Sequence, residues 1–516
     1  MISAHRLRQV GRTASARVGH TLAIRTKATA ASVEPKSWDA IPRVSPTLPI
    51  VGSALKLAMV EPRNTAVNMH RIIRELVAEY GPIMRLRMPG ASQDSIITAD
   101  ADMTADVFRA DGPTPKRMAP PTWDFFRKRN DLPAGIVMEQ GDEWKRLRSA
   151  IQPPIFPPKS AHAFCSKVDQ ITAQAMDVME RELRRAGPEV LEGRKTVALE
   201  DLVVRWSIES VSKIVLGQTL GALNDPPNPV AREMVDAFYG VLSTTTPVLL
   251  LPEFAWRMEL TPAVRTHFKA MQASMDLTAK FMATTFTECA ADPSKLDGTF
   301  LGHVLRRDAT LTRDEMLASA VDILMAGFDT TKYAVLFTLN LLGRHPDVQA
   351  KLRDEIVAVV GADPIAPVTE AHLAQFKYLK NVIKESLRVY SIAPVLSRFA
   401  PRGTVVGGYA VPKGTEFLMA MEITSRSDRY FTNPDKFVPE RWDGKDVHPF
   451  ASLPFSFGSR SCVGRRLAEM EMTVFLAHFL RRFEILPAPA PDKIVFNLVL
   501  MNEDPIPLRL RPLAAL

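Results

Sequence analysis

Residues 454–471 read PFSFGSRSCVGRRLAEME, and they place Cys462 between a glycine-containing loop and a predicted helix. The unpaired N–H groups and the positive dipole end at the start of a helix stabilise a thiolate, the form of cysteine that binds metals. Gly458 and Gly464 allow a tight turn and a close approach of the backbone to a flat ligand. Arg460 adds a fixed cation for an acidic group. This stretch therefore predicts a cysteine that ligates the metal of a flat, acidic cofactor.

The ordinary explanation for a lone cysteine before a helix is a buried structural side chain. The spacing around Cys462 favours a metal ligand, because five positions match the pattern F-x-x-G-x-R-x-C-x-G. These are Phe455, Gly458, Arg460, Cys462 and Gly464. On these residues the chain resembles the cytochrome P450 superfamily of haem-thiolate monooxygenases. The resemblance implies haem b as the cofactor, Cys462 as the iron ligand and Phe455 packed near the sulfur.

The fold implied by this resemblance is a single large, mainly α domain with a minor β region and a long central helix over the haem. The 516 residues are 46% hydrophobic and 24% charged, which allows a large core and does not indicate disorder. No repeat or low-complexity linker divides the sequence. The three cysteines, Cys165, Cys289 and Cys462, are too few for a disulfide framework and indicate a reducing compartment.

The first 33 residues contain several Ser, Thr and Ala and six cations, and no acidic residue precedes Glu34. This composition resembles a mitochondrial transit peptide, and a disordered basic tail is the alternative. Removing six positive charges from the formal net charge of +8 leaves +2, so we expect a local basic docking patch and no nucleic-acid partner. No apolar run approaches the roughly 18 residues of a membrane span. The expected location is therefore the matrix side of the inner mitochondrial membrane, with peripheral contact.

Proline punctuates residues 40–52, so we expect this segment to be extended. The expected organisation is a transit peptide over 1–33, a Pro-rich hinge over 34–52 and the haem-thiolate catalytic domain over 53–516. An amphipathic helix is predicted over Met69–Tyr80. The stretch GPIMRLRM that follows it alternates apolar and polar residues and predicts the first strand of the β region.

Trp144 and Arg148 lie four residues apart in GDEWKRLRSA and therefore share one face of a predicted helix. A surface cation lying on an aromatic ring is the alternative interpretation. By resemblance to the family's W-x-x-x-R motif, both side chains reach a haem propionate. The resemblance also implies that Arg398 and Arg460 neutralise the propionates together with this pair. The preceding residues 111–132 are rich in proline and charge, and the resemblance makes them a loop over the active site.

Residues 244–258, TTTPVLLLPEFAWRM, combine two prolines with a strongly apolar run and interrupt a helical pattern. A buried loop is one interpretation, and the segment is too short to span a membrane. The corresponding region of the family dips into the membrane surface and covers the pocket. We therefore expect peripheral membrane contact at this segment.

A long central helix is predicted from a capping box, Thr312 with Glu315, to about Gly343, where a histidine and a proline end it. Its middle, residues 326–331, reads AGFDTT. A mid-helix glycine and polar groups in an apolar helix both cost stability, which indicates a functional reason for them.

The hexapeptide matches the family's A-G-x-[DE]-T-[TS] motif. By resemblance, Ala326 and Gly327 allow the helix to lie close to the haem. Asp329 and Thr330 are then the acid and the alcohol that supply protons for the activation of dioxygen.

Glu385 and Arg388 are adjacent on the surface of another helix, predicted over Phe376–Tyr390. A solvent-exposed salt bridge is the default interpretation. The pair matches the family's E-x-x-R motif, and Arg441 in the segment PERW completes its network. The resemblance implies that Glu385, Arg388 and Arg441 are structural and hold the Cys462 loop in place.

The sequence contains no strand-preceded G-x-G-x-x-G pattern and no length for a fused flavin domain, so electrons come from a separate protein. By resemblance to the mitochondrial subgroup, Lys380 and Lys384 dock a ferredoxin together with Arg465 and Arg466. Solvated surface charge is the alternative for each pair. The implied donor is an adrenodoxin-type ferredoxin, which NADPH reduces only indirectly through ferredoxin reductase.

The implied reaction is the insertion of one atom of dioxygen into a C–H bond of a small apolar substrate, with a sterol or steroid favoured over a xenobiotic. Lys332 stands where many relatives carry a small hydroxyl residue, and Ser391 replaces a common proline, so the substrate's identity does not transfer. A haem-thiolate protein that binds or isomerises a ligand without oxygen turnover is the alternative. Members of that kind often lose the acid–alcohol pair, and the presence of Asp329 and Thr330 argues against it.

Overall fold

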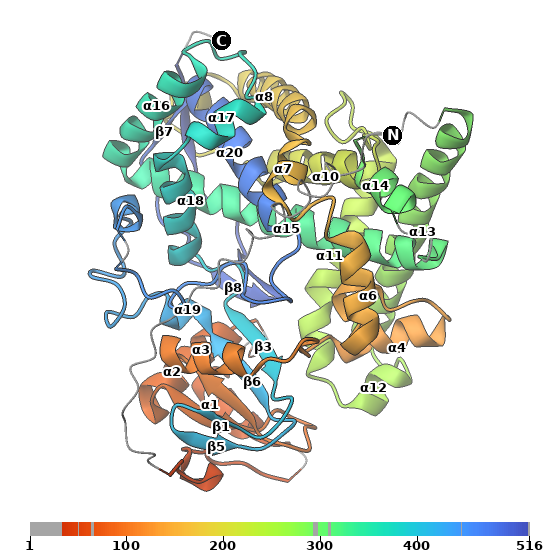
Figure 1. The fold of residues 1–516 in the computed structure, drawn as a ribbon. Coiled ribbons are helices and arrows are strands. Elements are labelled where there is room, and N and C mark those ends of the chain that lie inside the picture. The colour runs from red at the N-terminus through yellow and green to blue at the C-terminus, as the bar shows by residue number, and fades with distance from the viewer. Residues whose placement is uncertain are drawn as a thin grey trace, which may run out of the picture.

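The computed structural model describes residues 34–49, 51–62, 65, 67–292, 298–307, 311–444 and 446–513 (Figure 1). The predicted transit peptide over residues 1–33 lies outside the described residues. Helices dominate the described chain and its strands are short, which confirms the expected mainly α fold with a minor β region.

The β region lies at the lower end of the view in Figure 1 and is built around a four-stranded sheet with the order β1-β2-β6-β3. Strand β2 pairs parallel to β6, and the other two pairings are antiparallel. Ser95 donates a hydrogen bond of 2.8 Å to Glu416 across the parallel pair, although the two residues are 321 positions apart in sequence. The strands span Ile83–Leu86 (β1), Ser95–Thr98 (β2), Val395–Phe399 (β3) and Glu416–Ala420 (β6).

Three helices lie beside this sheet, and the described chain also has three two-stranded ribbons. The helices are α1 (Ala54–Val60), α2 (Met69–Tyr80) and α3 (Ala101–Ala110). The ribbons are β4 (Thr404–Val406) with β5 (Tyr409–Val411), β7 (Phe483–Leu486) with β10 (Arg509–Pro512), and β8 (Ile494–Asn497) with β9 (Val499–Asn502). The ribbon of β7 with β10 lies at the opposite end of the view in Figure 1. The prediction of α2 is confirmed to the residue, and the strand predicted after it is β1. The described residues within 41–53 contain no helix, and Val44 donates to the carbonyl of Arg85 in β1, as expected for an extended segment.

The helical part surrounds α15 (Arg313–Arg344), which has 32 residues and is therefore about 48 Å long. Figure 1 shows α15 crossing this part of the molecule. The capping box is confirmed, because Thr312 accepts from the N–H of Glu315 and Glu315 accepts from the N–H of Thr312. The long helices nearby are α8 (Cys165–Ala186), α10 (Glu200–Val215), α11 (Pro229–Leu249), α13 (Pro262–Ala291), α16 (Pro346–Val360), α18 (Tyr378–Val389) and α20 (Arg465–Arg482).

Shorter helices complete the described chain. They are η1 (Trp38–Ala40), α4 (Pro121–Arg129), α5 (Gly135–Met138), α6 (Gly141–Ile151), α7 (Pro158–His162), α9 (Pro188–Leu191), α12 (Glu253–Arg257), α14 (Phe300–Arg307), α17 (Glu370–Gln375), α19 (Met421–Thr424) and η3 (Pro439–Trp442). Among the described helices, none is both long enough and apolar enough to cross a membrane.

The expectation of a loop over residues 111–132 is wrong in part, because α4 lies inside it. Pro121 occupies the first helical position, where its missing N–H costs no hydrogen bond. Trp123 and Phe126 bury one face of the helix, and basic residues 127–129 stand in its last turn, where they favour the negative dipole end.

The predicted interruption of helical structure after residue 244 also begins later than expected. Helix α11 continues through Pro247 to Leu249. A proline so close to a helix end removes only one hydrogen bond, and the buried side chains of Thr245 and Val248 keep the last turn packed. Thr245 also accepts a hydrogen bond of 2.9 Å from the indole N–H of Trp123 in α4.

Candidate active site

The loop before α20 holds Cys462 in a fixed position. The N–H of Cys462 donates to the carbonyl of Phe455 at 2.9 Å. Gly458 has φ +78°, in the left-handed region that favours glycine, and Ser461 donates to its carbonyl to close a turn. Gly464 precedes α20, and a Cβ added there would lie 4.0 Å from the sulfur of Cys462.

The thiol of Cys462 is accessible, although the surrounding protein also desolvates it. This desolvation raises the pKa of the thiol, while the N–H groups of Gly464 and Arg465 and the positive charges of Arg148 and Arg117 act in the opposite direction. The helix start therefore contributes the expected donors but does not by itself yield a lowered pKa. A bound metal cation would favour the thiolate further, as it does for any coordinating cysteine.

Arg460 lies at the centre of a cluster of buried and half-buried arginines. Its guanidinium stacks on the ring of Trp144 at 4.2 Å, and the residue is 4% exposed. Nη2 donates to Gln140 at 3.1 Å, but Nε and Nη1 are buried without a hydrogen-bond partner. Burial lowers the pKa of Arg460 to about 9, and the charges of Arg117, Arg398 and Arg148 contribute further.

The other predicted cations belong to the same cluster. Arg148 is 8% exposed, and burial lowers its pKa to about 10. Arg398 in β3 is 2% exposed and pairs with Asp111 at 2.9 Å. The positive charges of this cluster repel each other, and Arg460 has buried N–H donors without a partner. Both features favour an anionic ligand, so the cluster fits the two carboxylates of haem.

Arg117 is a member of this cluster that the sequence did not single out. It is half-buried, and burial followed by the charge of Arg398 lowers its pKa. Its side chain donates to the carbonyl of Val137 at 3.1 Å. The sequence did not identify Arg117, because arginines in proline-rich segments are ordinarily solvated and no motif includes this one.

The middle of α15 is open on one side. Ala326 is exposed and Gly327 and Thr330 are half-buried, although Met325 and Phe328 beside them are buried. The hydroxyl of Thr330 donates to the carbonyl of Ala326 at 2.8 Å. It therefore competes with the backbone N–H groups of the helix for this carbonyl, as expected of this threonine. An accessible patch in the middle of a buried helix is what a flat ligand lying against it requires.

Gly327 has a packing reason that the motif did not suggest. A Cβ added there would lie 2.9 Å from the side chain of Val211 in α10, so glycine permits α10 and α15 to approach closely. The hydroxyl of Ser207, one turn earlier in α10, donates to the carbonyl of Phe328 at 2.8 Å. The predicted contact of Gly327 with haem stays a prediction.

Asp329 does not stand alone in α15. Its carboxylate is 2.8 Å from the ammonium of Lys332, and both residues are almost fully buried. The sequence marked Lys332 as a departure from relatives but did not predict this ion pair.

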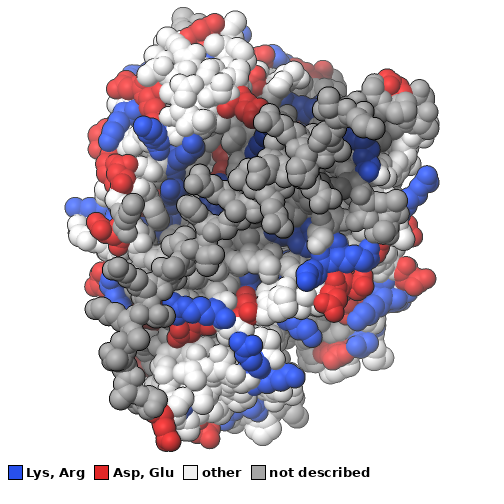
Figure 2. Space-filling view, in the orientation of Figure 1, with Lys and Arg blue, Asp and Glu red and all other residues white. Residues whose placement is uncertain are grey.

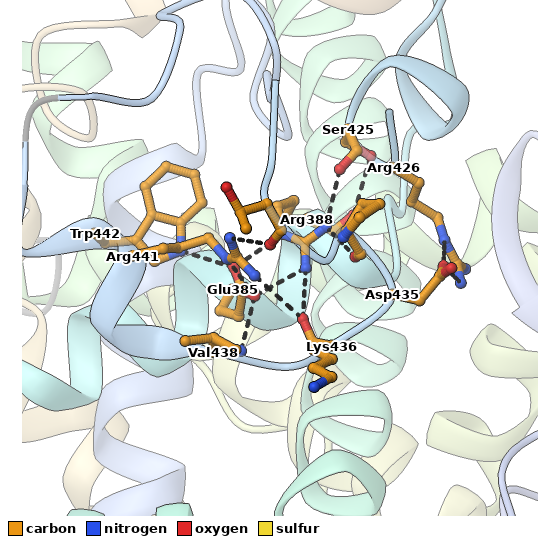
Figure 3. Close-up of polar contacts among 11 residues, drawn as sticks. Glu385, Arg388, Ser425, Arg426, Asp435, Lys436, Val438, Arg441 and Trp442 are labelled. Atoms are coloured by element: carbon orange, nitrogen blue, oxygen red, sulfur yellow. Dashed lines mark hydrogen bonds and ion pairs between the residues drawn. The ribbon is translucent and has the colours of Figure 1, made fainter. Parts of the chain in front are cut away.

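The E-x-x-R pair forms the buried network that the sequence predicted. Figure 3 shows Glu385 among Arg388, Arg441, Trp442 and Val438, and each donates to its carboxylate at 2.8–3.0 Å. The side chains of Glu385 and Arg388 are 0% exposed. Arg388 also donates to the carbonyls of Ser425, Pro434 and Lys436. The network ties α18 to η3 and the chain before it, and its predicted support of the Cys462 loop stays a prediction.

The predicted docking residues come together only in part. Lys380 and Lys384 are exposed on α18, and after burial the nearby charges of Lys384 and Arg466 help lower the pKa of Lys380. Arg465 and Arg466 each pair with Glu469 at 2.9 Å, so one acid offsets part of their charge. Figure 2 likewise shows cations and anions interspersed over the described part of one face.

The fold and the arginine-lined cysteine site define a helical oxidoreductase of the haem-thiolate type. A family model described as cytochrome P450 matches residues 42–510. The chain belongs to the cytochrome P450 family, and it is a monooxygenase with a haem-thiolate cofactor. The pattern around Cys462 thus identified the family.

Curated relatives match over most of the chain. The mitochondrial cholesterol side-chain cleavage enzyme of Oncorhynchus mykiss is 29% identical over 450 residues, 86% of each chain. The mitochondrial 25-hydroxyvitamin D-1 alpha hydroxylase of Rattus norvegicus is 30% identical over 458 residues, 86% of this chain and 89% of the relative. The corresponding enzyme of Homo sapiens is 31% identical over 453 residues, 86% and 87% of the two chains.

Proposed function

We propose that this monooxygenase is mitochondrial and hydroxylates an apolar, sterol- or steroid-like substrate with dioxygen and electrons from an adrenodoxin-type ferredoxin. The observation that carries the proposal is the set of relatives. Enzymes named for cholesterol and for 25-hydroxyvitamin D, all named mitochondrial, match 86% of the chain. A mitochondrial enzyme acting on xenobiotics is the second candidate, because Lys332 and Ser391 depart from the pattern of many relatives and the substrate does not transfer from them.

The residues around the cysteine would hold the haem. Cys462 ligates the iron, Phe455 packs beside the sulfur, and Gly458 and Gly464 shape the loop. When bound, the haem supplies the activation of dioxygen that allows one oxygen atom to enter a C–H bond. On the carboxylate side, the cations and the ring that receive the propionates are Arg117, Trp144, Arg148, Arg398 and Arg460.

The middle of α15 serves the proton chemistry. Ala326 and Gly327 lie against the cofactor, and the hydroxyl of Thr330 holds a proton near the open patch. Asp329 passes protons toward this hydroxyl, as an acid within the same helical turn can. Support comes from the 2.8 Å hydrogen bond of Thr330 to Ala326, which fixes the hydroxyl at the open side of the helix.

Peripheral membrane contact is supported by exposed apolar side chains on two helices. Leu55 and Met59 of α1 are 46% and 68% exposed, and Phe254 of α12 is 61% exposed. Both helices lie at the lower end of the view in Figure 1. Met258, just after α12, is 68% exposed. These side chains would enter the interface of the inner mitochondrial membrane from the matrix side.

A spectral screen tests the substrate class. Compounds that displace water from ferric haem shift its absorption band, so a sterol panel and a xenobiotic panel are titrated side by side. We expect saturable shifts with sterols that carry few polar groups. Shifts confined to the xenobiotic panel would favour the second candidate.

Reversing the charge of Lys380 and Lys384 together should weaken ferredoxin binding by about tenfold or more, or about 1.4 kcal/mol. Surface charges steer an acidic partner, and a Debye length of about 8 Å at physiological salt makes that steering dependent on ionic strength. The measurement is the apparent dissociation constant and the rate of first reduction at several salt concentrations, with substrate-induced spectra unchanged.

The matched control for this variant reverses Lys269 and Lys280, two exposed lysines of α13. The same change in net charge there should leave ferredoxin binding near its original value. Full turnover with a microsomal-type diflavin reductase and none with ferredoxin would contradict the proposed partner.

A further inference from the structure

Lys332 is a buried cation held by three groups. Its ammonium lies 2.8 Å from Asp329, donates to the hydroxyl of Tyr239 at 2.6 Å, and sits 3.6 Å from the centre of the Tyr333 ring. Lys332 is 2% exposed. Burial of an ammonium costs several kcal/mol unless it is paired, so these contacts keep the charge in place.

Tyr239 links this cation to α11. Its ring packs edge-on against Phe328 at 5.3 Å, and burial followed by the charge of Asp329 raises the pKa of its hydroxyl. The hydroxyl therefore keeps its proton at neutral pH. Because it accepts from Lys332 and lies near the carboxylate of Asp329, it can pass a proton between them.

The start of α10 connects the cluster to the surface. Its first two residues are Glu200 and Asp201. Helix α10 runs antiparallel to α15, because Val211 faces Gly327 while Ser207, earlier in α10, donates to the carbonyl of Phe328, later in α15. The pKa of Glu200 is raised by burial and lowered in turn by the charge of Lys332. Asp201, whose charge acts on Tyr239, has a side chain that is 59% exposed.

We propose that Lys332 reprotonates Asp329, directly or through the hydroxyl of Tyr239, and regains its proton from solvent at the start of α10, where Glu200 and Asp201 stand. The ammonium of Lys332 is an acid within 2.8 Å of the carboxylate of Asp329, so it can supply the proton that Asp329 passes on. The N–H bond of Lys332 breaks as the O–H bond of Asp329 forms, and no electron is transferred. Lys332 acts through Asp329 and is a positioning residue, so the inference rests on the proposed role of Asp329 and Thr330.

The experiment measures how reduced dioxygen is divided between products, and it needs no substrate. Hydrogen peroxide forms from dioxygen with two electrons and two protons, whereas water requires four of each, so slow proton supply favours peroxide. Peroxide is quantified per NADPH consumed, with whichever donor, ferredoxin or diflavin reductase, reduces the protein. The solvent deuterium isotope effect and the pH profile of this ratio are measured in parallel.

Lys332→Met and Lys332→Arg should both raise the peroxide ratio severalfold, because proton transfer by a positioned acid contributes about 100-fold or more. Arginine keeps the positive charge but does not give up its proton. Tyr239→Phe should shift the ratio in the same direction. Tyr333→Phe is the matched control, because it preserves the ring under the ammonium, and it should leave the ratio and the isotope effect unchanged.

The outcomes distinguish failure of the relay through Lys332 from failure of the proposed role of Asp329 and Thr330. Thr330→Ala and Asp329→Asn serve as references, and if neither changes the ratio, the proposed role of the acid–alcohol pair fails. If the references change it and the lysine variants do not, the relay through Lys332 alone is refuted. Wild-type behaviour of Lys332→Arg would show that only the charge matters, which also overturns the relay. The reduced carbon-monoxide spectrum reports folding, and Tyr239→Phe, which removes one hydroxyl, decides the question if the lysine variants do not fold.

Discussion

Replacing Cys462 by alanine should abolish the far red-shifted carbon-monoxide band of the reduced protein. When bound, the haem would show this band only if a thiolate ligates its iron, and Cys462, whose N–H donates to the carbonyl of Phe455, lies beside four arginines that would receive the acidic groups of the cofactor. The measurement is the difference spectrum of the reduced protein with and without carbon monoxide. The effect is all-or-none, because no other ligand replaces the sulfur's electron donation.

Cys165→Ala is the matched control, since Cys165 also stands at the start of a helix, α8. Cys165 is 2% exposed, its sulfur donates to the carbonyl of Val368, and burial raises the pKa of its thiol to about 12. This variant should keep the band. Retention of the band in Cys462→Ala would remove the basis of the whole site assignment.

Glu385→Ala should destabilise the protein by about 3–5 kcal/mol, because it leaves Arg388 buried without its counter-ion. The carboxylate serves five hydrogen bonds from Arg388, Arg441, Trp442 and Val438, all of which would lose their acceptor. The measurement is the denaturant midpoint together with the fraction of purified protein that carries haem. Both should fall sharply.

Glu440→Ala provides the comparison within the same segment. Glu440 has a side chain that is 43% exposed and pairs with Lys351 at 2.7 Å, a surface ion pair worth about 0–1 kcal/mol. The double variant Glu385→Leu with Arg388→Met should recover part of the lost stability, because it removes both buried charges. Equal effects of Glu385→Ala and Glu440→Ala would contradict the structural role of the network.

Local signals predicted the parts of the fold that depend on neighbours in sequence. The start of α15 follows from reciprocal capping by Thr312 and Glu315, and α2 follows from its apolar period. The Cys462 loop and the E-x-x-R pair were predictable because fixed spacings carry them. In each case the residues that decide the structure lie within a few positions of each other.

Contacts between distant segments explain what the sequence did not predict. Helix α4 forms within a proline-rich stretch because Trp123 and Phe126 find partners in α11 and α13. Tyr239, which accepts a hydrogen bond from Lys332, is 93 residues away in sequence. Arg117 belongs to the arginine cluster only because the fold places it near Arg398 and Arg460. Tertiary packing overrides local propensity at each of these places.

The parallel pairing of β2 with β6 imposes an order on synthesis. The ribosome adds about 5–20 residues per second, so the chain waits about 15–60 s between making Ser95 and making its partner Glu416, 321 residues later. During that interval Ile96 and Ile97, both buried in the finished sheet, lack the neighbouring strand that covers their edge. An open, apolar strand edge recruits other chains. We therefore expect this edge of the nascent chain to need protection until β6 is made, a requirement that a sheet built from consecutive strands would avoid.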